Sequence, residues 1–300
     1  MIIANPLYDT AFKSLISDKE VAKAVIGALL ETEVLDIDIQ PTEYVKPQTD
    51  EDKLPHTIRL DFCVKIKNEA GEAQKVLIEI QKASGSGVIY RFREYLAMAG
   101  YRPKPAKEAE LPIITIYFLG FELKNIPTSC LHVSRQYIDM HDKKIIKAKE
   151  QFVELLTHDS YIIQVPRIKT SEKPTTKLET VLSVFEQEDI KKISSDITMN
   201  YKFPIKDDYQ KKMIDILHYI GADPKTRDVL EGERYWLVDD EFKEGEILRK
   251  DRLLQEKEKT IAKKDNTINT TVIALKDMGI PLEKIAEITK LSIDDIKNIN

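Results

Sequence analysis

Two short segments of alternating apolar and polar residues, 59–66 and 75–81, constrain the fold of this chain more than any other feature. In each segment every second residue is Leu, Ile, Val or Phe, which is the pattern of a β-strand with one apolar face. The polar connection between them contains Gly71 and favours a turn. The sequence therefore predicts an antiparallel hairpin. A further run at 112–119 is β-branched and almost wholly apolar, which is typical of a strand buried on both faces.

The alternation also predicts how the two strands of the hairpin pair. If the turn is centred on Ala70, the numbers of paired residues sum to 140, so that Asp61 faces Glu79. A shift by two residues keeps the same faces and pairs Asp61 with Gln81 or Leu77, whereas a shift by one residue would bury the acids. Directly opposed side chains have Cβ atoms about 4.5–5.5 Å apart, and like charges at that separation destabilise a sheet.

A divalent cation would remove this repulsion between the two carboxylates. Mg²⁺ prefers oxygen ligands and commonly binds one or two carboxylates together with substrate phosphate and water. Asp61, Glu79 and the backbone carbonyl of Ile80 are therefore a candidate partial shell for Mg²⁺ or Mn²⁺, and the amide of Gln81 is a candidate for orienting an attacking water. Spacing alone leaves two interpretations open, namely this metal site and an ordinary polar sheet face with solvated acids.

Helical patterns flank the predicted strands. Apolar residues recur at three-to-four spacing in 8–30 and again in 88–101. Further strands are expected near 131–138 and 160–166, and the polar segment 167–177 predicts a linker. The pattern downstream of the linker is helical, over roughly 176–199, 206–221 and a long stretch from about 240. The predicted domains are an α/β domain at 1–166, a helical domain at 167–240, and a long helix with a helix-turn-helix-like tail at 241–300.

Four pieces of sequence carry a resemblance to a known family. They are Arg59-Leu60-Asp61 with Ile78-Glu79-Ile80-Gln81, YDTAFK at 8–13, FREY at 92–95 and ITIYFL at 114–119. In this order they resemble the hairpin, opening helix, Arg-plus-Tyr helix and later core strand of PD-(D/E)XK nucleases, and more narrowly the recombination-promoting nuclease and PD-(D/E)XK transposase-like families. The chain departs from the broad pattern at Leu60, in place of Pro, and at Gln81, in place of Lys. The narrower families commonly have E-x-Q.

The resemblance implies a restriction-endonuclease-like α/β fold, with a mixed sheet flanked by helices, followed here by an all-α C-terminal region. It also implies Mg²⁺-dependent hydrolysis of phosphodiester bonds in DNA, with Asp61 and Glu79 holding the metal and a bound water of lowered pKa as the nucleophile. Gln81 lacks the positive charge that would stabilise the reacting phosphate. Two alternatives follow: the activity is lower, or a cation such as Lys13 or Arg93 compensates.

The family resemblance leaves two roles open for Asp9, assistance through a second metal or a water, and capping of its helix. The candidate DNA-binding strip is 82–107, where six basic residues against the single acid Glu94 give a local charge of +5 in a chain of net charge −5. Contacts with phosphates would be sequence-independent and sensitive to salt. The alternative is a solvated helix. The basic residues are Lys82, Arg91, Arg93, Arg102, Lys104 and Lys107.

Composition excludes some classes of protein. With 46 basic and 51 acidic side chains the chain has no general basic coat. It has no apolar run of the roughly 20 residues that span a bilayer, and its two cysteines cannot form a disulfide framework, so a cytoplasmic location is expected. In the tail, Ser292 is the predicted N-cap of a final short helix. This candidate recognition helix, 292–297, begins with acids, which favours protein interaction or self-association of the C-terminal helices over DNA reading.

The sequence thus predicts a metal-dependent DNA endonuclease linked to mobile elements, recombination or defence. The alternative from a different class is a catalytically inactive nuclease fold that serves as a module for DNA binding or protein interaction. RNA as the substrate is a third alternative.

Overall fold

The computed structural model describes residues 1–39, 43–45, 57–59, 62–68, 70–82, 88–97, 110–171, 174–187 and 196–299. The chain forms two compact units, Met1–Glu241 and Phe242–Asn300. The predicted class is confirmed at the level of a mixed α/β fold, with a six-stranded mixed sheet flanked by helices and with helices at the C-terminal end.

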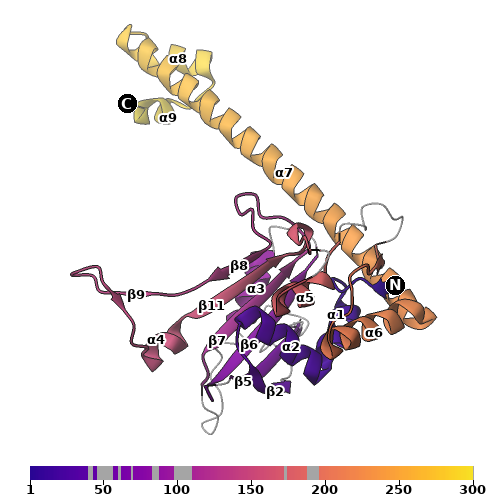
Figure 1. Cartoon of the computed structure of the whole chain (residues 1–300). Coiled ribbons are helices and arrows are strands. Elements are labelled where there is room, and N and C mark those ends of the chain that lie inside the picture. Colours follow the sequence, from indigo (N-terminus) through magenta and orange to yellow (C-terminus); the bar gives the residue numbers. More distant parts are fainter. Residues whose placement is uncertain are drawn as a thin grey trace. The chain divides into compact units, whose positions relative to one another are not determined.

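The six-stranded sheet forms the centre of the first unit (Figure 1). In spatial order its strands are β2 (Val34–Ile39), β5 (Phe62–Asn68), β6 (Ala73–Gln81), β7 (Ile113–Leu119), β11 (His158–Gln164) and β8 (Cys130–Val133). β7 pairs in parallel with β6 and β11, while the remaining neighbours are antiparallel. This position inside the sheet accounts for the apolar run that predicted the strand.

The predicted hairpin and its register are confirmed for the described residues. Phe62 pairs with Ile78 and Val64 with Val76, so the numbers of paired residues sum to 140 as predicted. The turn contains Gly71 at φ 80°, a left-handed conformation that glycine adopts without steric cost. Asp61, which the prediction places opposite Glu79, lies outside the described residues.

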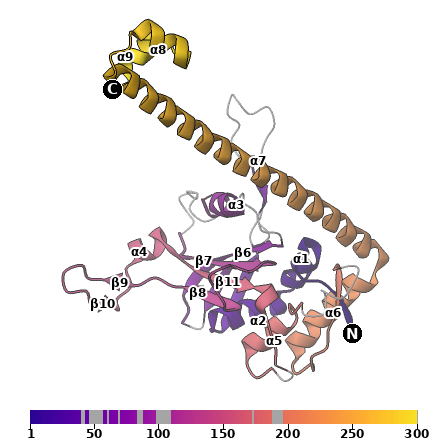
Figure 2. The ribbon, with the colours of Figure 1, turned by 90° about the horizontal axis from the view of Figure 1, so that it is seen from above.

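Helices cover both faces of the sheet. α1 (Asp9–Ser17) and α2 (Lys19–Leu30) lie on one side and α3 (Val88–Tyr95) on the other (Figure 2). The sequence pattern predicted one helix over 8–30, but the helix is interrupted at Asp18. The carboxylate of Asp18 accepts hydrogen bonds from the backbone N–H groups of Glu20 and Val21, and it therefore caps α2.

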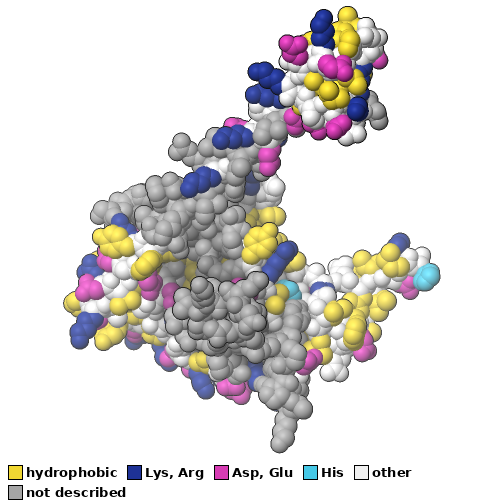
Figure 3. All heavy atoms as spheres, turned by 180° about the vertical axis from the view of Figure 1, so that it is seen from behind, with side chains coloured by type: hydrophobic (Ala, Val, Ile, Leu, Met, Phe, Trp, Pro, Cys, Tyr) yellow, Lys and Arg dark blue, Asp and Glu magenta, His cyan; other side chains and the backbone are white. Residues whose placement is uncertain are grey.

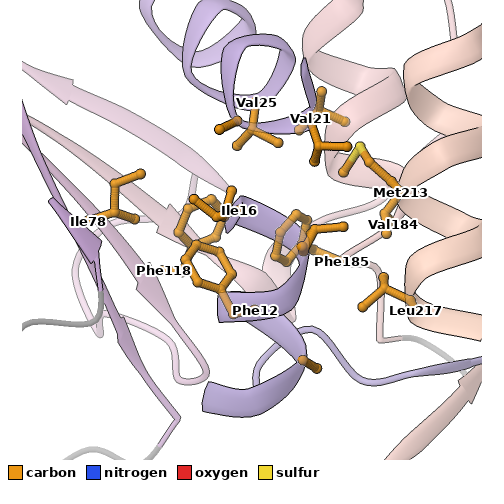
Figure 4. Close-up of a cluster of buried hydrophobic side chains, with 14 of the residues drawn as sticks. Phe12, Ile16, Val21, Val25, Ile78, Phe118, Val184, Phe185, Met213 and Leu217 are labelled. Atoms are coloured by element: carbon orange, nitrogen blue, oxygen red, sulfur yellow. The ribbon is translucent and has the colours of Figure 1, made fainter. Parts of the chain in front are cut away.

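Three aromatic rings join the sheet to the segments around it. Phe12 of α1 lies against Phe118 of β7 and Phe185, with ring centroids 5.4 and 6.4 Å away, and Phe118 stacks on Phe185 at 4.8 Å (Figure 4). All three side chains are fully buried. Phe185 follows α5 (Lys177–Ser183), a helix of the predicted region 167–240.

The rest of that region packs into the same hydrophobic core. β12 (Thr198–Asn200) pairs with the N-terminal strand β1 (Ile2–Ala4), and α6 (Asp208–Ala222) contributes Met213 and Leu217 to the core. The helical pattern predicted over 176–199 ends at Ser183. The predicted division at residue 166 stays a prediction, which a folding experiment can decide.

Smaller elements complete the first unit. β3 (Glu43–Val45) pairs with β4 (Thr57–Arg59), and β9 (Tyr137–Ile138) pairs with β10 (Ile145–Ile146). A short helix, α4 (Gln151–Leu156), precedes β11, which continues into the 3₁₀ turn η2 (Val165–Arg167).

The second unit is wholly helical. It contains the later part of α7 (Pro224–Asp277), then α8 (Leu282–Thr289) and α9 (Ile293–Asn298). Val272, Ile285 and Ile296 form its core, one from each helix. Ser292 caps α9 as the sequence predicts. Self-association through these helices stays a prediction. No helix within the described ranges is both long and apolar enough to cross a membrane.

Candidate active site at the carboxyl end of strand β6

Glu79 and Gln81 lie on the face of the sheet that α3 covers. Side chains of β6 alternate between the faces, so Ile78 packs into the main core with α1, whereas Leu77 belongs to a smaller cluster that Leu96, just beyond α3, also contacts. Glu79 and Gln81 follow Leu77 by two and four residues and therefore share its face. Only 4% of Glu79 and 8% of Gln81 is exposed.

The neighbouring strand β7 supports this pair of polar side chains. Tyr117 is the register partner of Glu79 and Leu119 that of Gln81. The ring of Tyr117 stacks on Phe92 of α3, with centroids 4.7 Å apart, so α3 is anchored directly beside Glu79. Buried carboxylates in proteins are paired with cations or coordinate metals, because a charge without compensation loses its hydration at high cost.

A close backbone contact holds the ends of β6 and β7 together. The N–H of Gly120 donates to the carbonyl of Gln81 at 2.7 Å. A Cβ atom at position 120 would lie 2.5 Å from the carbonyl oxygen of Lys82, so a residue larger than glycine would push the two strand ends apart. Gly120 therefore sets the position of Gln81 relative to β7.

An ionic cluster centred on Asp196 begins at Lys82, the residue after β6. The Nζ of Lys82 lies 2.5 Å from Asp196 Oδ2 and 3.6 Å from the centre of the Tyr8 ring. The hydroxyl of Tyr8 donates to Asp196 Oδ1 at 2.6 Å, and Arg234 Nε lies 3.6 Å from the same oxygen. One carboxylate thus serves two cations and a phenol, and it holds Lys82 partly buried at the end of β6.

The environment of the Asp196 cluster shifts two pKa values in opposite directions. Burial raises the pKa of Asp196, but the hydrogen bonds from Lys82 and Tyr8 lower it more, so that the net pKa lies below its ordinary value. Burial and the hydrogen bond to the Asp196 carboxylate raise the pKa of Tyr8. At neutral pH the carboxylate is therefore ionised and the phenol is neutral.

We expect the contribution of Asp196 to stability to be lost in acid. Because its pKa is lower in the folded than in the unfolded chain, the stabilisation is present above the ordinary carboxyl pKa and disappears as the pH falls through the folded value. Urea unfolding between about pH 7 and about pH 3 should therefore show a smaller decrease in unfolding free energy for Asp196→Asn than for the native chain. The control is Asp215→Asn, an exposed carboxylate of α6, which should follow the native curve. Parallel curves for native chain and Asp196→Asn would contradict this assignment.

The predicted assisting residues on α1 contact each other. The Nζ of Lys13 lies 2.9 Å from Asp9 Oδ2. The predicted alternative role of Asp9 as the helix cap is wrong, because the N-cap residue is Tyr8 and Asp9 is the first residue of the helix. The backbone N–H of Thr10 is satisfied by Glu233 of α7, at 3.1 Å. Asp9 instead places a negative charge in the first turn, where the helix dipole favours it.

The candidate DNA-binding strip is described only in part. Arg93 is exposed on α3, and Lys82 is held by Asp196. The side chain of Arg91 lies outside the described part of the structure, as do Asp61 and the residues of the strip beyond α3, Arg102, Lys104 and Lys107.

Two described groups are of the kind that Mg²⁺ binds. The carboxylate of Glu79 and the backbone carbonyl of Ile80 are oxygen donors from neighbouring residues of β6, and Mg²⁺ prefers oxygen ligands. Among the described residues, no group of three or more His, Cys, Asp or Glu side chains is placed to hold a metal ion.

The Asp196 cluster was not anticipated from the sequence. Lys82 and Asp196 are 114 residues apart, and no local pattern marks Asp196. The only sequence feature that pointed to this cluster was Lys82 itself. It is a cation that directly follows β6, a strand whose residues are largely buried.

Fold and site together define a mixed α/β protein with a carboxylate and an amide buried at the end of a central strand. Comparison of the chain with protein-family models, with curated proteins and with solved structures finds no match.

Proposed function

We propose that this chain is a metal-dependent endonuclease of the PD-(D/E)XK superfamily, near the recombination-promoting nuclease and transposase-like families, that hydrolyses phosphodiester bonds in DNA. The observation that supports it best is the β5–β6 hairpin, which has the predicted register and carries Glu79 and Gln81 on one face at its carboxyl end. A role in mobile elements, recombination or defence, and a cytoplasmic location, belong to the same proposal.

The proposal requires Asp61 to face Glu79. The described pairing begins with Phe62 opposite Ile78, and the proposal extends it by one residue. Asp61, Glu79 and the carbonyl of Ile80 would then supply three oxygen ligands from two adjacent strands. When bound, Mg²⁺ polarises the phosphate and lowers the pKa of a coordinated water.

The remaining steps belong to side chains of the chain itself. The amide oxygen of Gln81 would accept a hydrogen bond from the attacking water and so orient it toward the phosphorus. α3, anchored through Phe92 on Tyr117, would limit the water that reaches this face of the sheet. Arg93 on α3 would contact the DNA backbone together with the other basic residues of 82–107.

The second candidate function is a nuclease fold without catalysis, which binds DNA or a protein. Two observations favour it. Glu79 is almost fully buried. Gln81 occupies the position of the family's Lys, and Lys82, the next residue in the sequence, is paired with Asp196.

Conversion of supercoiled plasmid to the nicked form separates the two functions. We expect the native chain to nick DNA with Mg²⁺ or Mn²⁺ and not with EDTA. Asp61→Ala should lower the rate by about a hundredfold or more, because removal of a metal ligand costs several kcal/mol of transition-state stabilisation.

The matched control is Asp215→Ala, which removes an exposed carboxylate of α6 and should nick at the native rate. Nicking that persists unchanged in Asp61→Ala would refute the proposed site. Binding of plasmid without nicking would favour the non-catalytic function, and cleavage of an RNA substrate alone would replace DNA by RNA.

A further inference from the structure

A projecting arm at residues 134–157 has no place in the proposed active site. It consists of the two-stranded ribbon β9–β10 followed by α4, and it extends from the edge of the sheet at β8 (Figures 1 and 2). The ribbon closes through a turn in which the N–H of Asp139 donates to the carbonyl of Lys144 at 2.9 Å. Every residue from Met140 to Phe152 is exposed.

The base of the arm is fixed to the sheet by Arg135. Its guanidinium lies 2.7 Å from a carboxylate oxygen of Glu154 and 3.1 Å from one of Asp159, and it also donates to the carbonyl of Thr157 at 2.7 Å. Tyr137 donates to the other carboxylate oxygen of Glu154 at 2.6 Å. Arg135 thus makes charge-assisted contacts with three different acceptors, and such contacts are stronger than neutral hydrogen bonds. The base of the ribbon is therefore fixed in one position.

The exposed surface of the arm combines cations with apolar side chains. Segment 143–149, KKIIKAK, has four lysines and no acid. In the part of the chain that the structure describes, Lys144 pairs with Asp142 at 2.7 Å, whereas Lys147 and Lys149 make no ion pair. Figure 3 shows hydrophobic side chains gathered along the arm. The large apolar residues are Ile138, Met140, Ile145, Ile146, Phe152 and Leu156, each exposed by nearly half or more.

We infer that this arm is a binding surface for double-helical DNA. A two-stranded β-ribbon fits a groove of duplex DNA, lysines along it contact phosphates, and an apolar residue at the tip can insert between base steps. Lys147 and Lys149 supply the phosphate contacts. Met140, 74% exposed in the turn, is the tip residue. The choice of DNA as partner rests on the proposed function, which it extends by a contact outside the active site.

Charge argues against a second copy of this chain as the partner of the arm. A two-fold symmetric contact brings the same surface of both copies together. The four lysines of 143–149 would then lie near the four lysines of the other copy, and the flanking acids Asp139, Asp142 and Glu150 would offset only part of this charge. A polyanion removes this repulsion, and released counterions add to the affinity.

Fluorescence anisotropy with a labelled duplex of about three helical turns tests the inference. The measurement is made in EDTA over a series of salt concentrations, so that cleavage does not enter. Lys147→Gln with Lys149→Gln should weaken binding about ten- to thirtyfold near physiological salt and reduce the slope of log affinity against log salt by about 1.8. Met140→Ser should weaken binding and leave that slope unchanged, because it removes no charge.

The matched control is Lys19→Gln with Lys211→Gln, two exposed lysines of α2 and α6 that change the net charge equally. It should keep the native slope. The inference is overturned if the native chain does not bind the duplex, or if arm variant and control bind alike. The inference is also overturned if the arm variant keeps the native DNA affinity but loses another interaction. That interaction would be self-association, measured by sedimentation, or binding to vesicles of anionic lipid.

Failure of the two proposals is distinguishable. Arm-dependent binding without any plasmid nicking would remove the proposed nuclease activity and leave the arm's role intact. Metal-dependent nicking, together with DNA binding that does not depend on the arm lysines, would remove the proposed role of the arm and leave the nuclease activity intact.

Discussion

A Glu79→Gln variant is expected to nick supercoiled plasmid about a hundred to a thousand times more slowly than the native chain. The substitution keeps the size of a side chain that is only 4% exposed, so it creates no cavity, but it removes the negative charge that would hold the metal. A neutral amide binds Mg²⁺ weakly, and the loss should be smaller at high concentrations of Mn²⁺. The measurement is the initial nicking rate as a function of metal concentration.

The control for this prediction is Glu110→Gln, an exposed carboxylate just before β7, which should nick at the native rate. A urea unfolding curve of Glu79→Gln checks that the fold is kept. Native nicking by a folded Glu79→Gln protein would exclude Glu79 as a metal ligand and refute the proposed site.

Replacing Phe185 by Ala is expected to lower the free energy of unfolding by about 3–5 kcal/mol. Phe185 is fully buried, and its ring packs on Phe118 of the sheet and faces Phe12 of α1. Because these contacts join region 167–240 to the sheet, the loss should appear as a shift of one cooperative transition of the first unit. Urea unfolding followed by fluorescence and by circular dichroism measures the free energy of unfolding and shows whether the first unit unfolds in one transition.

Phe152→Ala is the matched control for the stability measurement. Phe152 of α4 is 71% exposed, so the same truncation should change the unfolding free energy by less than about 0.5 kcal/mol. Two separate transitions, of which only one responds to Phe185→Ala, would show that 167–240 folds as the separate domain predicted from the sequence.

Strand pairing was predictable because its cause is local. The period of two in 59–66 and 75–81 decides which side chains share a face, and a slip by one residue would exchange the two faces. The pairs Phe62 with Ile78 and Val64 with Val76 follow directly. In the same way, the unbroken apolar run of β7 predicted a central strand, and Ser292 predicted the start of α9.

The break between α1 and α2 could not be predicted from the local sequence. Apolar spacing continues across Asp18, and so it predicted one helix over 8–30. Asp18 instead accepts backbone hydrogen bonds as the cap of α2, and its carboxylate also pairs with Lys212 of α6 at 2.7 Å. A contact with a helix so distant in sequence leaves no trace in the pattern around residue 18.

By itself the sequence determined the hairpin, its register and the face that carries Glu79 and Gln81, because these depend on the alternation of neighbouring residues. Only the tertiary structure decided that Lys82 is bound by Asp196 and Tyr8, and that the ribbon β9–β10 stands out from the sheet on the Arg135 network. These features arise from contacts between residues far apart in the chain. The free energy of such contacts depends on the burial and geometry that the whole fold creates.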